Sequence, residues 1–237
     1  MSVYLCVLDF EATCWEGELV KHKQEIIEFP SVLYELVEFG QTNQANQENQ
    51  SNQENQSNQT NQVKYIGEFS KYVRPVYEPI LSKFCTELTG ITQDKVDLAD
   101  PIEIVYEQHY QWLNSMTNSS SQIYIITCGA WDLNMMLPKE ILNKNLHYYS
   151  VYKRFINIKS EFEYVYKVSS GGMVNMLNHL NIKLEGRHHS GIDDTKNIAK
   201  ILLKIISDGH INFEIKYVIE KDKKNIKNKK DKKNNKF

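Results

Sequence analysis

The sequence lacks any stretch near the ~18 apolar residues that a membrane helix needs, and it lacks a charged start followed by an apolar run. No CxxC pair occurs among its four cysteines, Cys6, Cys14, Cys85 and Cys128. Three of these cysteines lie in apolar surroundings, as reduced cysteines of intracellular proteins do. We therefore expect no membrane association and a cytoplasmic protein, with the nucleus as the alternative location.

A strong excess of charge is also absent, because 28 basic and 30 acidic residues leave a formal net charge of -2. This balance excludes a surface that attracts nucleic acid over its whole extent, so any such contact must be local. Hydrophobic residues make up 41% of the 237 residues, which is enough for one sizeable core. We predict one principal domain over residues 1–215.

Two segments differ in composition from this domain: a Gln/Asn-rich stretch at residues 41–62 and a Lys/Asn-rich tail at residues 216–237. Neither has enough apolar residues to offset the entropy of ordering, so we predict that both are disordered. The first interrupts a predicted hairpin, where a long insertion costs little free energy beyond the entropy of loop closure. We therefore expect that it takes no part in catalysis. The tail either attracts phosphates nonspecifically or is a solvated end.

The rest of the chain alternates between strand and helix patterns. Strands are predicted at "SVYLCVLDF", at the hairpin "IIEFPSVLYELVEF" and "YIGEFSKYVRP", at "QIYIITC" and, last, at "RFINIKSEF". A helix is predicted from "DPIEIVYEQHYQWLNSM", with Asp100 as N-cap and Pro101 in the first turn, and others around Asp132, at "GGMVNMLNHLNI" and at "DDTKNIAKILLKIISDG". This order predicts an α/β fold, a mixed five-stranded sheet with helices on both faces.

Two acids, Asp9 and Glu11, directly follow the apolar run of the first predicted strand. Side chains at positions i and i+2 of a strand share a face, so these carboxylates are expected to project together. Close carboxylates in a region of low dielectric repel each other unless a cation lies between them. The alternative is that the strand ends at Asp9 and both acids are hydrated.

The same pattern recurs in "IYIITCGAWD", which ends at Asp132, and in "HHSGIDDTKN", where acids begin an amphipathic helix. Acids at such ends converge on one edge of an α/β sheet. Carboxylate ligands favour Mg²⁺ or Mn²⁺ over Zn²⁺. Two such ions about 4 Å apart are the usual apparatus for phosphodiester displacement, so we expect two Mg²⁺ or Mn²⁺ ions as cofactors.

Four motifs, "DFEATC", "LSKFCTELTGITQDKVDLAD", "WD" and "GRHHSGIDDTKNIAKI", occur in this order. Together they resemble the motifs of the DEDDh (DnaQ-like) 3′-to-5′ exonucleases, and most of all the enhanced-RNAi and histone-mRNA-trimming exoribonucleases and the prion-protein-interacting exonuclease. The resemblance covers residues 3–209 apart from the insertion. It implies an RNase H-like exonuclease fold.

The resemblance also implies roles for individual residues. It makes four acids the metal ligands and a histidine the base that takes a proton from the attacking water: Asp9, Glu11, Asp132, Asp194 and His189. It places the 3′-terminal nucleotide against residues from three of the motifs: Ala12, Thr13, Leu88, Thr89 and Trp131. For Trp131 the alternative is a place in the core.

His188 stands where the most similar relatives have proline. Adjacent side chains on an extended segment point to opposite sides, so we expect that His188 and His189 do not share one ion and that only His189 functions. The apolar stripe of the last predicted helix extends back through Asp194. We therefore predict that Asp194 faces the sheet and the metals, while Asp193 lies outward, where it caps free N–H groups or complements the positive end of the helix dipole.

These features predict a metal-dependent 3′-to-5′ exoribonuclease that trims single-stranded RNA tails or short 3′ overhangs and releases nucleoside 5′-monophosphates. Its expected partner is RNA. One alternative keeps the chemistry but acts on DNA, because metal ligation does not read the 2′-hydroxyl. Another alternative is a noncatalytic RNA-binding adaptor. The presence of all five implied catalytic residues argues against it.

Overall fold

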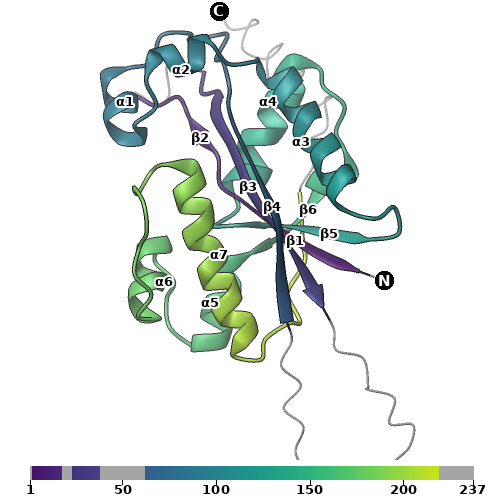
Figure 1. Ribbon diagram of the computed structural model, residues 1–237. Coiled ribbons are helices and arrows are strands. Elements are labelled where there is room, and N and C mark those ends of the chain that lie inside the picture. Colours follow the sequence, from purple (N-terminus) through teal and green to yellow (C-terminus); the bar gives the residue numbers. More distant parts are fainter. Residues whose placement is uncertain (1, 18–22, 38–61, 219–237) are drawn as a thin grey trace, which may run out of the picture.

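The computed structural model describes residues 2–17, 23–37 and 62–218, and the disorder predicted for residues 41–61 and 219–237 lies outside the described residues. A seven-stranded sheet forms the centre of the fold, in the order β2-β3-β1-β5-β6-β7 with β4 paired to β3 (Figure 1). Its strands are β1 (Val3–Leu8), β2 (Glu11–Ala12), β3 (Ile26–Val37), β4 (Gln62–Tyr72), β5 (Gln122–Thr127), β6 (Arg154–Asn157) and β7 (Lys216–Tyr217).

The sheet is mixed, as the sequence predicts. Strand β3 runs antiparallel to β1 and to β4, which is the predicted hairpin, while β5 runs parallel to both β1 and β6. The five longer strands correspond to the five predicted ones. The two-residue strands β2 and β7 have too short a pattern to be predicted from sequence.

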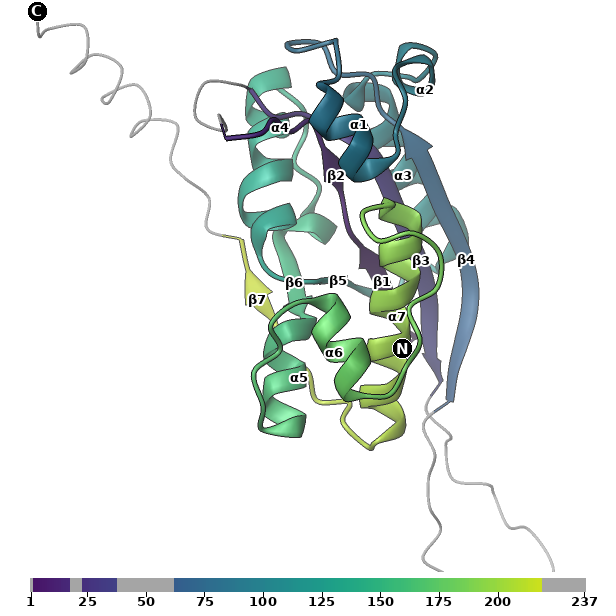
Figure 2. The same ribbon diagram turned by 90° about the vertical axis from the view of Figure 1, so that its left-hand side faces the viewer.

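Helices cover both faces of the sheet (Figures 1 and 2). They are α1 (Lys83–Thr89), α2 (Gln93–Asp97), α3 (Ile102–Met116), the π-helical turn η1 (Asp132–Met136), α4 (Leu137–Lys144), the 3-10 turn η2 (Ser150–Lys153), α5 (Ile158–Tyr166), α6 (Met173–His179) and α7 (Gly191–Ser207). On β1, Cys6 and Leu8 pack towards α3 and α4, whereas Leu5 and Val7 pack towards α5, α6 and α7. This alternation gives two apolar cores, one on each side of the sheet.

Two predicted element boundaries differ from the structure. Helix α3 begins at Ile102 with Pro101 as its N-cap residue, because the backbone carbonyl of Asp100 instead accepts from the Arg74 N–H. The strand predicted over "RFINIKSEF" ends at Asn157, whose side chain caps α5 by accepting from the Lys159 N–H at 3.1 Å. In both cases the element was predicted correctly and its boundary was wrong.

The described fold also extends beyond the domain boundary predicted at residue 215. Lys216–Tyr217 pair with β6, and the Val218 N–H donates to the Lys153 carbonyl at 2.9 Å. At the other predicted segment, β4 already begins at Gln62. Over the described part of the chain, no helix combines the length and the apolar character needed to cross a bilayer.

Candidate active site

Three carboxylates converge at one edge of the sheet. Asp9 directly follows β1, Glu11 begins β2, and Asp194 lies in the first turn of α7. One carboxylate oxygen from each lies within 4.8 Å of the others. The sequence prediction that Asp9 and Glu11 project together therefore agrees with the geometry, and the alternative of two separate hydrated acids does not.

The fourth acid, Asp132, reaches the same place from β5. Because β5 runs parallel to β1, both strands end at the same edge of the sheet. Asp132 begins the turn η1 and is only 6% exposed, and its Oδ1 accepts from the Phe10 N–H at 3.2 Å. Phe10 separates Asp9 from Glu11 in the chain, so this hydrogen bond holds Asp132 beside the other three acids.

Burial raises the pKa of all four acids. The pKa of Glu11 rises to about 8, first through burial and then through the charge of Asp194. Burial raises the pKa of Asp132 to about 6. Burial and the neighbouring Asp132 charge raise the pKa of Asp9 well above its usual range, and burial also raises that of Asp194. These carboxylates are stable together only with bound protons or a bound cation.

The donor set fits a divalent metal ion. Within the described residues, neither Asp9 nor Glu11 has a hydrogen-bond or ion-pair partner, and Asp194 Oδ1 is buried without one. Close carboxylate oxygens without a protein cation are the ligands that hard divalent ions prefer. Asp9, Glu11, Asp132 and Asp194 are therefore the residues able to hold such an ion.

A fifth carboxylate, Glu28 on β3, fixes the start of α7 and was missed by the sequence analysis. Glu28 is 3% exposed and pairs across the sheet with Glu11. Its carboxylate accepts from the N–H groups of Gly191 at 3.0 Å and Ile192 at 3.2 Å, while the N-cap residue Ser190 makes no side-chain cap. An acid inside the apolar run "IIEFP" was the available signal for this contact.

The glycine at the start of α7 allows this close approach. A Cβ atom at Gly191 would lie 3.0 Å from both Glu28 Oε2 and Pro30 Cγ. The carboxylate of Glu28 also complements the positive end of the helix dipole. A side chain distant in sequence thus caps the helix that carries Asp194.

The two adjacent histidines do not point to opposite sides, and that expectation was wrong. His189 has a left-handed backbone conformation with φ 66°, so the segment is not extended. The imidazole rings of His188 and His189 stack with centroids 3.9 Å apart and planes at 24°. His188 Nε2 lies 3.9 Å from Asp194 Oδ2, the same oxygen that accepts from the His189 N–H at 2.9 Å.

His189 lies beside the acids in a form suited to accept a proton. Its side chain is half-buried, and burial, followed by the neighbouring His188 and Arg187, lowers its pKa below the usual value. The imidazole is therefore neutral near pH 7. A neutral imidazole next to a cluster of metal-ligating acids can serve as a general base.

Asp193 and Asp194 face different partners, as the helix register predicts. Asp194 is 4% exposed and faces the acids. Asp193 Oδ2 instead accepts from the Arg187 N–H at 2.9 Å. The Arg187 guanidinium donates in turn to the carbonyls of Glu87 at 2.5 Å and Leu88 at 3.2 Å. These bonds connect the histidine loop, residues 187–190, to the end of α1.

The residues implied for nucleotide contact fall into two groups. The hydroxyl of Thr13 accepts from the Glu25 N–H at 3.0 Å, and that of Thr89 donates to the Cys85 carbonyl at 2.8 Å, so both hydroxyls have protein partners. Ala12 and Leu88 are half-buried. Trp131 is 44% exposed directly before Asp132, which excludes a place in the core and leaves its ring open to a ligand.

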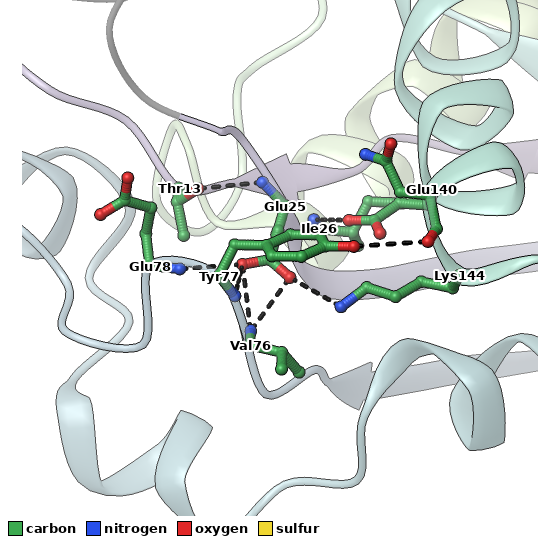
Figure 3. A network of polar contacts seen from close by, with 9 residues as sticks. Thr13, Glu25, Ile26, Val76, Tyr77, Glu78, Glu140 and Lys144 are labelled. Carbon is green, nitrogen blue, oxygen red and sulfur yellow. Dashed lines mark hydrogen bonds and ion pairs between the residues drawn. The ribbon is translucent and has the colours of Figure 1, made fainter.

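Another buried acid, Glu25, whose N–H donates to the Thr13 hydroxyl, lies in a network of paired groups (Figure 3). Its carboxylate accepts from the N–H groups of Val76, Tyr77 and Glu78, the shortest at 2.7 Å, and pairs with Lys144 Nζ at 3.2 Å. This network fixes the segment before α1.

Comparison with known proteins identifies the family. The sequence profile of the RNase T exonuclease family matches residues 6–202. The chain belongs to this exonuclease family. Among solved structures, the nuclease domain of 3′hExo, a DEDDh family member bound to rAMP, matches with a TM-score of 0.75 and 32% identity, over 91% of this chain and 97% of that one.

Curated relatives agree with this family. The chain is 37% identical over 211 residues to 3′-5′ exoribonuclease 1 of Rattus norvegicus, covering 87% of this chain and 54% of the relative. It is 30% identical to the 3′-5′ exonuclease Snipper of Drosophila melanogaster, covering 87% of this chain and 70% of the relative. The chain thus spans about half the length of the first of these. The RNase H-like fold is confirmed, and enzymes of this family depend on divalent metal ions.

Proposed function

We propose that the exonuclease removes nucleotides from the 3′ end of RNA and releases nucleoside 5′-monophosphates. The carboxylates of Asp9, Glu11 and Asp194, each with an oxygen within 4.8 Å of the others, carry this proposal together with Asp132 beside them. Such a cluster suits hydrolysis of a phosphodiester, whose negative charge needs divalent cations for stabilisation. The relatives named as exoribonucleases support RNA as the substrate.

In this proposal Asp9, Glu11, Asp132 and Asp194 hold two Mg²⁺ or Mn²⁺ ions. When bound, these ions supply Lewis-acid stabilisation of the charge that develops on the phosphate. His189, neutral through its lowered pKa, takes a proton from the attacking water at a ring nitrogen. Asp194 orients this histidine by accepting from its backbone N–H.

Single-stranded 3′ tails and short overhangs are the proposed substrates. The half-exposed Trp131, next to Asp132, supports contact with the terminal base, because aromatic faces stack on bases regardless of their identity. The half-buried side chains of Ala12 and Leu88 can complete the contact. The hydroxyls of Thr13 and Thr89 remain bonded within the protein, so we assign them the support of this surface.

Degradation of matched oligomers by the purified protein tests this function. RNA and DNA strands of one sequence, each labelled at the 5′ end, are incubated with Mg²⁺, with Mn²⁺ or with a chelator. We expect stepwise shortening of the RNA from its 3′ end only with metal present. Faster degradation of DNA would instead indicate a DNA exonuclease. RNA binding without turnover in either metal would indicate a noncatalytic adaptor.

A further inference from the structure

The histidine loop offers a second set of ligands beside the acids. One ligand atom from each of His188, His189 and Asp194 lies within 4.8 Å of the others, and Asp194 also belongs to the acid cluster. We propose that these three residues bind a Zn²⁺-class transition-metal ion and that its binding inhibits the exonuclease.

The carboxylate in this set is already prepared for a cation. Asp194 is 4% exposed, and its Oδ1 is buried without a hydrogen-bond partner among the described residues. Folding has therefore already removed this carboxylate from water, and metal binding does not add that desolvation cost. Its Oδ2 lies 3.9 Å from His188 Nε2. An oriented anionic oxygen therefore faces an imidazole that donates no shorter bond to it.

The two imidazoles can approach this oxygen more closely. Ligand atoms of a tetrahedral site with bonds of ~2 Å lie about 3.3 Å apart, so distances within the set must shorten by up to about 1.5 Å. The side chain of His188 is 46% exposed, so solvent leaves it room to turn towards the ion from its stack on His189. His189 is held at its backbone by Asp194, so its ring moves over a short range only.

The donor types separate this set from the acid cluster. Two imidazoles and one carboxylate are a common ligand set for Zn²⁺ with an open fourth position, whereas carboxylates alone favour Mg²⁺ and Mn²⁺. Asp194 is shared, and His189 is the base under the proposed function. A transition-metal ion in the new site therefore competes for both, and the inhibition, unlike the binding, rests on that function.

Spectroscopic titration with Co²⁺, which reports tetrahedral nitrogen ligation through visible absorption bands, tests the binding without any substrate. We expect one Co²⁺ per wild-type chain with intense bands that Zn²⁺ abolishes stoichiometrically. His188→Gln is expected to weaken Co²⁺ and Zn²⁺ binding by about tenfold or more, since even indirect supports of metal sites contribute on that scale. The matched control is His147→Gln, which removes an exposed histidine elsewhere and should leave binding unchanged.

Inhibition is measured as the Zn²⁺ concentration that halves each variant's own Mg²⁺-supported rate, with circular dichroism to verify folding. A higher concentration for His188→Gln than for His147→Gln is expected. Equal Co²⁺ binding by wild type and His188→Gln, or an equal loss in the control, would overturn the proposed site. Absence of any nuclease activity with the Co²⁺ bands intact would instead overturn the proposed function and leave the site standing.

Discussion

The buried Glu25 and the half-buried Asp9 and Glu11 lie close together in the sequence and differ in their partners. Glu25 has a lysine and three backbone N–H groups around its carboxylate, whereas Asp9 and Glu11 have no such partner among the described residues (Figure 3). A satisfied carboxylate contributes to the stability of the fold. An unsatisfied one is costly without a ligand, and this difference separates the structural acid from the acids available to a metal ion.

Glu28 is intermediate between these groups. Its carboxylate lies across the sheet from Glu11 but accepts from two N–H groups at the start of α7. It thus uses hydrogen bonds rather than a cation to hold a charge beside the acid cluster. Glu28 therefore affects both the stability of α7 and the geometry of the site.

The largest expected effect follows removal of an unsatisfied acid. Asp9→Ala and Glu11→Ala should each abolish metal-dependent RNA cleavage, because each loses a proposed ligand. Their melting temperatures in chelator should stay equal or rise, since one of several repelling carboxylates is gone. Single-turnover rates and thermal melts measure both quantities. Near-normal cleavage by either variant would refute the proposed site.

The paired aspartates of α7 give the next contrast. Asp194→Asn should eliminate Mg²⁺-dependent hydrolysis, because the buried carboxylate is a proposed ligand. Asp193→Asn should keep most activity and lower stability by about 1 kcal/mol or less, because its side chain only accepts from the Arg187 N–H. Rates at saturating metal, together with denaturant melts, compare the two. The reverse order of activities would mean that the ligand is Asp193.

Removing the satisfied acid should instead destabilise the fold. Glu25→Ala leaves Lys144, whose side chain is 7% exposed, without its counter-ion and three N–H groups without an acceptor. We expect a loss of about 3–5 kcal/mol in the free energy of unfolding, measured by urea titration. At low temperature the remaining folded protein should still bind metal, and Lys144→Met with Glu25→Leu should recover part of the stability. Unchanged stability of Glu25→Ala would show that the network contributes little.

Glu28→Ala should affect both properties moderately. Loss of the cap at α7 costs about 1 kcal/mol of stability. Because the same contacts orient Asp194 and His189, we also expect a reduced kcat and a higher Mg²⁺ requirement with little change in KM. Glu28→Gln, which keeps one acceptor oxygen, serves as the conservative control and should recover part of the loss. A fall in stability with kcat and Mg²⁺ dependence unchanged would assign Glu28 a purely structural role.

The smallest expected effect is a pH dependence of stability without metal. The pKa of Glu11 is raised from 4.5 to about 8, so the folded state holds this proton more tightly than the unfolded state does. Its contribution is fully present below pH 4.5 and is lost as the pH rises towards 8. We expect the melting temperature in chelator to fall between pH 6.5 and 8, and Mg²⁺ to raise it more at pH 8. Glu11→Gln should flatten this fall, and a wild-type melting temperature that rises over the same range would contradict the sign.

Much of the architecture was accessible from residue patterns alone. The alternation of β1 between two cores, the hairpin of β3 and β4, and the amphipathic stripe of α7 are local periodicities that survive folding. Acids at the ends of such elements also predicted a common edge, because parallel strands end on the same side. The positions of Asp9 and Asp132 follow from this rule, whereas Glu11 begins the antiparallel strand β2 and Asp194 lies in the first turn of α7.

Only the tertiary structure decided which partner each polar group has. The cap of α7 comes from Glu28, 163 residues earlier in the chain, and Glu25 reaches Lys144 across 119 residues, so no local pattern encodes either contact. The stacked histidines depend on a left-handed backbone at His189 that a non-glycine residue adopts only when surrounding contacts hold it. Sequence determined where the charges stand along the chain, and packing determined which of them remain unpaired.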